Sequence, residues 1–289
     1  AAKIQKDEPM KKHTTFRIGG PADYFIMPSN EKELAETIRV CREFSIPIYI
    51  VGNGSNLLVG DKGFRGAIIQ LYKSMGTFQV EGNQITAQAG CSLAQIANAA
   101  LDAALTGFEF AAGIPGTLGG AVVMNAGAYG GEMKDVLTSV RVMTEEGEIM
   151  ELPAEKLGLG YRTSIIQEKR YIVLGAVISL TEGKKEEIKA QMDDLRQKRV
   201  SKQPLEYPSA GSTFKRPEGY FAGKLIQDSG LKGFTVGGAQ VSEKHSGFVI
   251  NKGNATAADV MELIRQVTAK VKEDTGVTME PEVKQIGEF

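Results

Sequence analysis

The chain is organised around one uncharged stretch, Gly113-Ile114-Pro115-Gly116-Thr117-Leu118-Gly119-Gly120-Ala121-Val122-Val123-Met124-Asn125-Ala126-Gly127-Ala128-Tyr129-Gly130-Gly131. Glycine recurs throughout this stretch, and each glycine weakens a regular helix or strand. Glycines this close together allow a backbone to bend sharply or to approach a ligand, and exposed N–H groups can bind the oxygens of a diphosphate. A set of tight turns between short strands is the alternative, and this stretch alone does not separate the two.

A shorter glycine turn, Gly52-Asn53-Gly54-Ser55-Asn56-Leu57, follows a predicted buried strand at residues 47–51. It is not the dinucleotide fingerprint of a Rossmann domain, because Leu57 stands where the third glycine is required and a strand is expected to follow. It is not a P-loop either, because no Lys-Ser or Lys-Thr pair follows the glycines. The turn offers a nest of N–H groups of the size of a phosphate, and a hairpin turn is the alternative.

Length and charge narrow the classes of protein. A chain of 289 residues is long enough for two or three domains, and its net charge of −1 argues against a general nucleic-acid binder. Cys41 and Cys91 lie far apart and the two histidines form no metal-type pair, so we expect no metal site and a reducing, cytoplasmic setting. No apolar run approaches the ~20 residues of a membrane span, and the first residues contain no hydrophobic signal region.

Capping residues and hydrophobic periodicity predict the regular elements. The expected helices are at residues 30–44, 92–107, 184–200, 221–228 and from 256 onward, and the expected strands are at residues 22–27, 47–51, 67–71, 77–81, 85–89, 136–144, 149–152, 171–180 and 248–251. The helix at residues 184–200 is expected to bury Ile188, Met192 and Leu195. The proline-containing segment at residues 202–208 is the predicted main domain boundary.

Few side chains are suited to chemistry, so a cofactor is expected to carry the difficult step. Arg162, in Tyr-Arg-Thr-Ser, can hold a developing oxyanion or a carboxylate. Ser212, in Gly-Ser-Thr-Phe, can donate a proton, and Glu282 lies beside a proline near the end of the sequence. Taken one at a time, these residues are more often structural: Arg162 would form a surface ion pair, Ser212 would be a turn residue, and Glu282 would be a solvated carboxylate.

Two further groups of residues have both a functional and a structural interpretation. Lys215 and Arg216, with Lys202 and Lys224 nearby in sequence, form a basic cluster that can bind an anion, although solvated surface charge is commoner. Cys91 directly precedes a predicted helix, whose N-terminus can activate a thiol. A packed structural cysteine is the favoured interpretation at this position.

Six motifs occur together in one order: Thr15-Phe16-Arg17-Ile18-Gly19-Gly20-Pro21-Ala22, Gly52-Asn53-Gly54-Ser55-Asn56, the stretch at residues 113–130, Tyr161-Arg162-Thr163-Ser164, Ala210-Gly211-Ser212-Thr213-Phe214-Lys215-Arg216-Pro217 and Glu280-Pro281-Glu282-Val283. In this combination the sequence resembles the UDP-N-acetylenolpyruvoylglucosamine reductase (MurB) family over almost its whole length. The resemblance implies an α+β chain with the FAD-binding fold of the vanillyl-alcohol-oxidase (PCMH) type and a C-terminal α/β substrate domain. It implies FAD-binding subdomains at residues 1–65 with 282–289 and at residues 66–202, and a substrate-binding domain at residues 203–281.

The resemblance also implies ligands and roles. FAD is the implied cofactor, bound non-covalently, and NADPH and a UDP-sugar are the implied substrates; no nucleic acid, membrane or obligate protein partner is implied. In the implied reaction NADPH reduces FAD, and hydride then passes to the enolpyruvyl double bond to give UDP-N-acetylmuramate for cell-wall peptidoglycan. By resemblance Ser212 delivers the proton, while Arg162 and Glu282 stabilise the enolate. The expected substrate contacts are Tyr161, Lys202, Lys215, Arg216 and Lys224.

The implied cofactor contacts come from the two glycine segments. They are Gly52, Asn53, Gly54, Ser55, Asn56, Leu57, Gly113, Ile114, Pro115, Thr117, Gly119, Gly120, Ala121, Asn125, Gly127 and Ala128. Thr117 and Asn125 are the expected polar contacts within the longer segment. A side chain at Gly119, Gly120 or Gly127 is expected to weaken flavin binding before it weakens folding.

Two departures from the longer type of this family matter. The longer type has an extra segment with a tyrosine that clamps the uridine, whereas the interval from Tyr161 to Ser212 is short here, which indicates the shorter type. Arg216 stands where the longer type has asparagine, and an arginine can hold the diphosphate in place of the clamp. An oxidase with flavin attached through Cys91, and a catalytically silent sugar-nucleotide-binding protein, remain the alternative functions.

Overall fold

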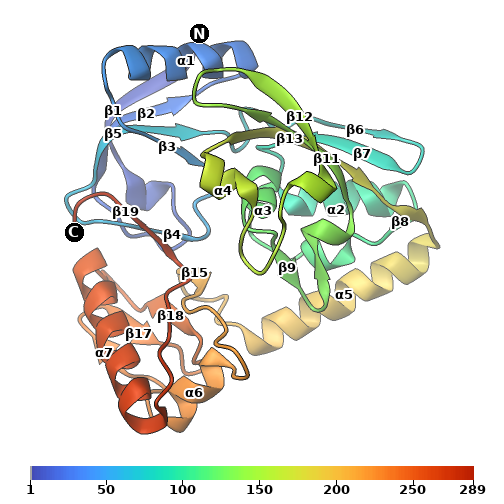
Figure 1. The fold of residues 1–289 in the computed structure, drawn as a ribbon. Helices are drawn as coiled ribbons and strands as arrows, with labels where there is room; N and C mark the ends of the chain where they lie inside the picture. The colour runs from blue at the N-terminus through green and yellow to red at the C-terminus, as the bar shows by residue number, and fades with distance from the viewer. Residues whose placement is uncertain (1) are drawn as a thin grey trace. The chain divides into compact units, whose positions relative to one another are not determined.

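The computed structural model describes residues 2–289 and divides the chain into two compact units (Figure 1). The first unit contains Phe25–Asn53 and Ala67–Arg199 together with the described residues before Lys6. The second contains Lys6–Tyr24, Gly54–Gly66 and Val200–Phe289. The units are therefore interleaved in sequence, and the division into three domains expected above stays a prediction.

The first part of the chain forms a four-stranded sheet in the order β1-β2-β5-β3. Its strands are β1 (Lys3–Pro9), β2 (Pro21–Met27), β5 (Phe64–Gln70) and β3 (Ile48–Val51). Between β2 and β3 the chain forms helix α1 (Glu31–Glu43), whose N-cap Asn30 accepts the Glu33 N–H at 2.9 Å. The cap at Asn30 and the strands β2 and β3 were predicted, because a cap and a short strand both depend on residues that are close together in the sequence.

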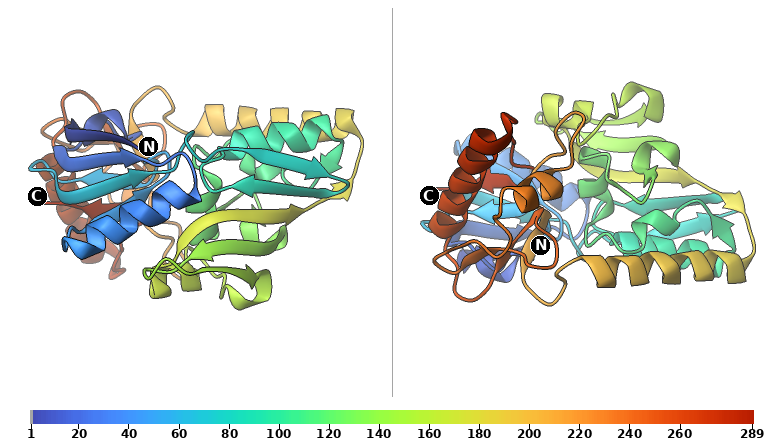
Figure 2. Two further views of the ribbon diagram at one scale, coloured as in Figure 1. Left: turned by 90° about the horizontal axis from the view of Figure 1, so that it is seen from above. Right: turned by 90° about the horizontal axis from the view of Figure 1, so that it is seen from below.

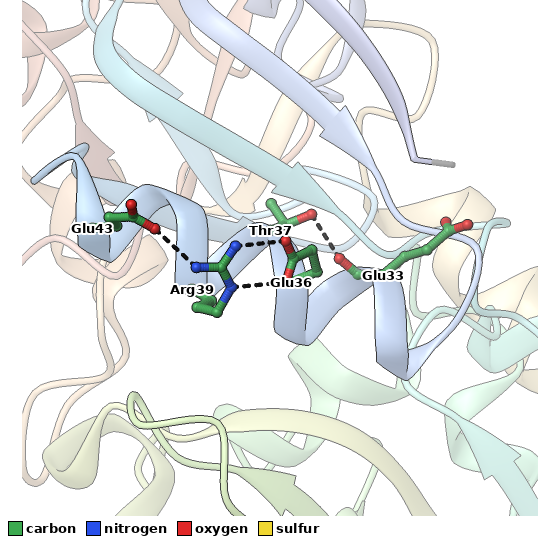
Figure 3. Close-up of polar contacts among 5 residues, drawn as sticks. All are labelled: Glu33, Glu36, Thr37, Arg39 and Glu43. Atoms are coloured by element: carbon green, nitrogen blue, oxygen red, sulfur yellow. Dashed lines mark hydrogen bonds and ion pairs between the residues drawn. The ribbon is translucent and has the colours of Figure 1, made fainter.

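The exposed side of α1 is covered by pairs of opposite charge (Figure 3). The Arg39 guanidinium donates to Glu36 at 2.7 and 2.8 Å and to Glu43 at 2.8 Å. These contacts, with Glu36 first, hold the pKa of Arg39 above its ordinary value. Their i,i+3 and i,i+4 spacing supports the helix locally, while Leu34, Ile38 and Cys41 are buried on its other side.

A five-stranded antiparallel sheet forms the centre of the first unit, in the order β12-β11-β13-β7-β6. Its strands are β6 (Phe78–Glu81), β7 (Gln84–Gln88), β11 (Leu137–Met143), β12 (Ile149–Pro153) and β13 (Ile172–Ser179). This unit also contains α2 (Leu93–Asp102), β8 (Leu105–Thr106), α4 (Ile165–Lys169), β14 (Thr181–Glu182) and α5 (Lys185–Lys202) up to Arg199. Figure 2 shows α5 running alongside α2, and Lys185 pairs with Asp102 at 3.1 Å.

The glycine-rich stretch is neither a single loop nor a set of turns alone. It contains a short helix, α3 (Leu118–Val123), followed by the small strands β9 (Gly127–Ala128) and β10 (Gly131–Glu132), which pair with each other. Two of the six residues of α3 are glycines, so helix propensity gave no signal for it. Its buried residues Leu118, Ala121 and Val122 hold it against the sheet instead.

The second unit has its own core. An antiparallel sheet in the order β15-β18-β17-β16 is formed by β15 (Ser209–Ser212), β16 (Thr235–Val236), β17 (Ala239–Val241) and β18 (Phe248–Asn251). Helices α6 (Ala222–Asp228) and α7 (Ala257–Thr275) pack with it, and Val260, Leu263 and Val267 of α7 are completely buried. The short strands β4 (Leu57–Val59) and β19 (Lys284–Ile286) form a parallel pair in the same unit.

Two expectations about helices were wrong. Helix α2 ends at Asp102 rather than Gly107, because Ala104 takes a left-handed conformation with φ of 55° and the chain turns into β8. In α5 only Ile188 is buried, while Met192 and Leu195 are half-buried. Helix α5 is strongly polar, and the hydrophobic periodicity of its sequence predicted more buried side chains than the structure contains.

Within residues 2–289, no helix is both long enough and apolar enough to cross a membrane. The same residues contain no group of three or more His, Cys, Asp or Glu side chains that could hold a metal ion.

Candidate active site

The two glycine segments meet within the first unit. The Asn53 side-chain amide donates to the Pro115 carbonyl at 3.1 Å. Gly52 lies directly against Thr117, since a Cβ added at Gly52 would be 2.2 Å from Thr117 Oγ1. The Gln70 amide holds the Gly52 carbonyl at 3.2 Å. Asn53 and Pro115, which are 62 positions apart in sequence, are thus joined into one surface, as a shared cofactor cradle requires.

The backbone of this surface is open at particular glycines. Gly113, Pro115 and Gly120 are exposed, and a Cβ at Gly120 would meet only Thr117 Oγ1, at 3.7 Å. An uncharged, exposed backbone with no side chain in front of it suits the close approach of a diphosphate or a ribityl chain. The residues present therefore fit the predicted cofactor.

The three glycines grouped together above are not equivalent in the structure. A Cβ at Gly127 would lie 2.6 Å from the Gly131 carbonyl oxygen and 2.7 Å from Glu132 Cβ, and one at Gly119 would lie 3.0 Å from Ala89 Cβ. A side chain at Gly127 must therefore disturb the local fold first, which corrects the expectation that flavin binding would suffer before folding. Of Gly119, Gly120 and Gly127, only Gly120 combines exposure with free space for a Cβ.

Asn125 organises the end of the stretch. Its Nδ2 donates to Glu132 Oε2 at 2.6 Å and to the Gly160 carbonyl at 3.1 Å, and its Oδ1 accepts the Lys134 N–H at 2.9 Å. Its side chain is 2% exposed, as is that of Thr117. These two residues hold the backbone in place here, and their direct contact with a cofactor stays a prediction.

The remaining cofactor candidates of the first unit are backbone elements of the same surface. The Ile114 N–H donates to the Ala111 carbonyl at 3.0 Å, and Ala121 lies in α3, with its N–H donating to the Thr117 carbonyl at 2.9 Å. Ala128 pairs with Gly131 across the β9–β10 turn.

Arg162 lies at the tip of a tight turn that is fastened to the glycine stretch. Gly160 and Thr163 exchange backbone hydrogen bonds of 3.2 and 3.3 Å, and Arg162 between them has a left-handed φ of 56°. The Gln167 amide donates to both the Arg162 and the Val123 carbonyls, at 3.2 and 2.9 Å. A non-glycine residue in this conformation is strained, and such strain is concentrated at functional sites.

Tyr161 belongs to the same turn. Its ring is 57% exposed and lies 5.5 Å from the Arg162 guanidinium carbon. The first unit therefore brings together Arg162, Tyr161 and the glycine surface, through Gly160, which Asn125 holds. Two residues that the sequence analysis did not identify also support this arrangement: Gln167 donates to the Arg162 carbonyl, and Glu132 accepts from Asn125. No motif or periodicity linked either residue to its partner.

The second half of the shorter turn lies in the second unit. Gly54 has φ of 63°, and a Cβ there would be 2.1 Å from the His13 carbonyl oxygen, so only glycine fits. Asn56 donates through Nδ2 to the Glu282 carbonyl at 3.3 Å, and its own carbonyl accepts the Lys284 N–H at 3.0 Å. Leu57 pairs with Lys284 in the β4–β19 ladder, and Ser55 is half-buried. Asn56 thus holds the backbone of Glu282, a candidate catalytic residue.

Ser212 and Glu282 are brought together by the backbone. The Glu282 N–H donates to the Thr213 carbonyl at 2.7 Å, directly after Ser212, and Phe214 bridges to Pro281. Thr213 is buried and accepts the Val249 N–H through Oγ1 at 2.9 Å, which fixes the end of β15. Ser212 is exposed and Glu282 is half-buried. These two residues belong to the second unit, whereas Arg162 belongs to the first.

The basic residues of the second unit do not form one compact cluster of unpaired charge. Lys215 pairs with Glu280 at 2.8 Å, Lys224 pairs with Asp228 at 2.7 Å, and Lys202 is exposed at the end of α5. The Arg216 guanidinium carbon lies 4.0 Å from the centroid of the Phe221 ring, which is 59% exposed. Exposed ion pairs are worth little, so an incoming diphosphate can compete for these cations.

Cys91 is a packed residue. It is completely buried, donates through Sγ to the Thr77 carbonyl at 3.2 Å, and burial raises the pKa of its thiol to about 11. The thiol is therefore almost entirely protonated near neutral pH and is a poor nucleophile.

Acid precipitation of the flavin-loaded protein is expected to leave the yellow colour in the supernatant, because Cys91 cannot reach or attack a flavin from its buried position. Absorbance of the supernatant and the redissolved pellet measures this directly. Wild type and Cys91→Ser should give the same result, whereas a yellow wild-type pellet that turns colourless in the variant would establish a covalent flavin.

Comparison with known proteins places these features in a family. A sequence profile described as an FAD binding domain matches residues 22–153, and one described as the C-terminal domain of UDP-N-acetylenolpyruvoylglucosamine reductase matches residues 203–286. The reductase of that name from Caldanaerobacter subterraneus subsp. tengcongensis is 57% identical over 286 residues, covering 99% of this chain and 94% of the relative. The chain belongs to the UDP-N-acetylenolpyruvoylglucosamine reductase family. The reductase from Agathobacter rectalis is also 57% identical, covering 99% of this chain and 95% of that relative.

The fold agrees with this family. The crystal structure of the MurB reductase from Thermus caldophilus matches with a TM-score of 0.85 and 36% identity, covering 99% of each chain. The predicted α+β fold, an FAD-binding fold of the vanillyl-alcohol-oxidase type followed by a C-terminal domain, is confirmed. Between Tyr161 and Ser212 the chain forms only α4, β13, β14, α5 and the start of β15, as expected for the shorter type of the MurB family.

Proposed function

We propose that this protein reduces the enolpyruvyl group of UDP-N-acetylglucosamine enolpyruvate to UDP-N-acetylmuramate, a step in the synthesis of peptidoglycan precursors, with NADPH as the reductant. Membership of the MurB family supports the reaction. The roles proposed for Ser212 and Glu282 rest on one observation. The Glu282 N–H donates a hydrogen bond to the carbonyl of Thr213, which directly follows Ser212, so Glu282 is held close to Ser212.

The proposed reaction adds a hydride to one carbon of the double bond and a proton to its neighbour. Bound FAD, once reduced by NADPH, would supply the hydride. Hydride addition places negative charge on the substrate carboxylate as an enolate, and a guanidinium such as Arg162 stabilises that charge. The strained turn and the Gln167 contacts hold Arg162 ready for this role.

Ser212 is the proposed proton donor to the enolate carbon. Its position at the end of β15 is fixed by pairing with Phe248, and its side chain is exposed to an incoming substrate. Glu282 acts as a neutral acid, or orients another donor, since an ionised carboxylate would repel the enolate. Asn56 and Thr213 hold the Glu282 backbone on both sides.

The exposed glycine backbone of the first unit would hold the diphosphate and ribityl parts of FAD, bound non-covalently. We propose that the C-terminal part, residues 203–281, binds the UDP-sugar, and that residues 1–65 with 282–289 and residues 66–202 serve the cofactor. Two free, buried cysteines suit a reducing compartment, and we expect the enzyme to work in the cytoplasm.

The visible spectrum during a sequential reaction tests the proposed function. The purified protein loaded with FAD should lose its yellow colour when NADPH is added without oxygen, and should regain it when the enolpyruvyl substrate follows. A sugar or alcohol oxidase would be bleached by its own substrate instead, and a silent binding protein would not be bleached at all. No bleaching by NADPH in a flavin-loaded sample would refute the reductase assignment.

Replacing Arg216 by alanine is expected to raise the KM for the UDP-sugar by about 10- to 100-fold, because a charge-assisted contact with the diphosphate is lost. The value of kcat should change much less, since the chemistry lies elsewhere. Steady-state kinetics with Lys232→Ala, an exposed lysine of the same unit, as the control measure this. An unchanged KM in a variant that still turns over would remove Arg216 from the substrate site.

A further inference from the structure

Arg199, near the end of α5, borders the first residue of the glycine stretch. A Cβ added at Gly113 would lie 3.2 Å from Arg199 Cδ and 3.6 Å from its Nη1. Gly113 is exposed and Arg199 is half-buried, and both belong to the first unit. The guanidinium therefore lies at the edge of the surface that the cofactor is proposed to cover.

Arg199 has no acidic partner among the residues that the structure describes. Within residues 2–289, no ion pair or hydrogen bond of its guanidinium is found, whereas Lys189 and Lys198 of the same helix pair with Asp193 and Asp194. Burial lowers the pKa of Arg199. A half-buried cation without a counter-charge costs free energy, which a bound anion would recover.

The cradle itself lacks positive charge. Residues 52–57 and 113–131 contain neither Lys nor Arg. A bound FAD brings the two negative charges of its diphosphate to a surface made of backbone and uncharged side chains. Backbone N–H groups bind phosphate oxygens but carry no net charge to balance them. A guanidinium at the edge of the surface supplies that balance with a planar set of donors that suits phosphate oxygens.

We propose that Arg199 binds an anionic oxygen of the bound FAD beside Gly113, as the counter-charge of an otherwise uncharged cradle. This inference rests on the proposed cofactor but not on the proposed sugar substrate. The anionic group is the diphosphate, or the pyrimidine edge of the flavin after reduction. Arg199 is then a cofactor-binding residue that no motif of the sequence indicated.

Titration of the apo-protein with FAD, followed by quenching of flavin fluorescence, tests this proposal. Arg199→Met should weaken FAD binding by about 10- to 100-fold, and Arg199→Lys, which keeps the charge but not the planar donors, should fall between it and wild type. Arg196→Met, an exposed arginine one turn earlier on α5, is the control and should bind FAD as wild type does. The apo Tm of Arg199→Met should be no lower than that of wild type, because the uncompensated charge is removed.

The midpoint potential of the bound flavin identifies the anionic group. If Arg199 binds the diphosphate, FAD affinity falls equally in both redox states and the potential is unchanged. If Arg199 binds the reduced pyrimidine edge, the potential of Arg199→Met becomes more negative. Both results support the proposal.

Equal FAD affinity and equal midpoint potential in wild type and Arg199→Met would overturn the proposal. A lowered apo Tm with unchanged FAD binding would also overturn it, because the side chain would then only pack on Gly113. If Arg199→Met does not fold, Arg199→Lys decides between the outcomes. An FAD affinity and a midpoint potential equal to those of wild type in Arg199→Lys would refute the proposed contact between the planar guanidinium and FAD. Failure of the wild type to bind FAD would instead refute the proposed function.

Discussion

Replacing Ser212 by alanine is expected to leave the reduction of flavin by NADPH unchanged and to slow its reoxidation by the enolpyruvyl substrate by about 10²- to 10⁴-fold, the usual contribution of a positioned proton donor. The reason is that hydride and proton reach different carbons, and only the second transfer needs the hydroxyl. Stopped-flow absorbance of the flavin separates the two half-reactions. The fold should survive, because Ser212 is exposed and the backbone pairing of β15 does not depend on its side chain.

Ser209→Ala is the matched control for this experiment. Ser209 lies in the same strand, and its backbone carbonyl, which alanine keeps, accepts the Thr15 hydroxyl at 2.7 Å. It should match wild type in both half-reactions. If Ser212→Ala reoxidised at the wild-type rate, the proton would come from another group, and Glu282 would be the next residue to test.

Gly120→Val is expected to weaken FAD binding by at least about 100-fold without lowering the stability of the apo-protein. The reason is geometric: the position is exposed, a Cβ would be 3.7 Å from its nearest neighbour, and the valine would occupy the space in front of the cradle. A glycine in the interior of a helix also costs about 0.5–1 kcal/mol relative to alanine, so Gly120→Ala should be slightly more stable than wild type. Flavin fluorescence and thermal unfolding of the apo-protein measure the two effects.

Gly127→Ala provides the contrasting variant. Its Cβ would lie 2.6 Å from the Gly131 carbonyl oxygen, so this change should lower the apo Tm as well as flavin occupancy. Comparison of Gly120→Val with Gly127→Ala therefore distinguishes two roles of glycine. Gly120 leaves space for a ligand, whereas Gly127 allows close packing of the neighbouring backbone. Wild-type FAD affinity in Gly120→Val would mean that α3 lies outside the cofactor site.

Elements set by neighbouring residues were predictable. Asn30, Ser92 and Thr256 cap α1, α2 and α7 as expected, because each cap depends on a side chain three residues from its partner. The hairpin between β6 and β7 follows equally from Gly82-Asn83.

The arrangement of the candidate site was not predictable from local pattern. Helix α3 forms in a glycine-rich segment because tertiary burial outweighs propensity. Asn125 reaches Gly160 across 35 residues of sequence, and Gly113 meets Arg199 from a different element. Such pairs depend on the packing of the whole unit, and no periodicity or cap encodes them. The interleaving of the two units in sequence has the same origin.

The late strand β19 has a consequence for biosynthesis. Its partner β4 is made early, since Asn56 and Glu282, which flank the pair, are 226 residues apart. At about 5–20 residues per second, β4 would wait roughly 10–45 s on the ribosome before its partner emerges. During that time an apolar strand edge is unpaired, which makes the nascent chain a substrate for chaperones. Glu282, a proposed catalytic residue, lies just before this strand, so a nascent chain that ends before residue 282 lacks that carboxyl group.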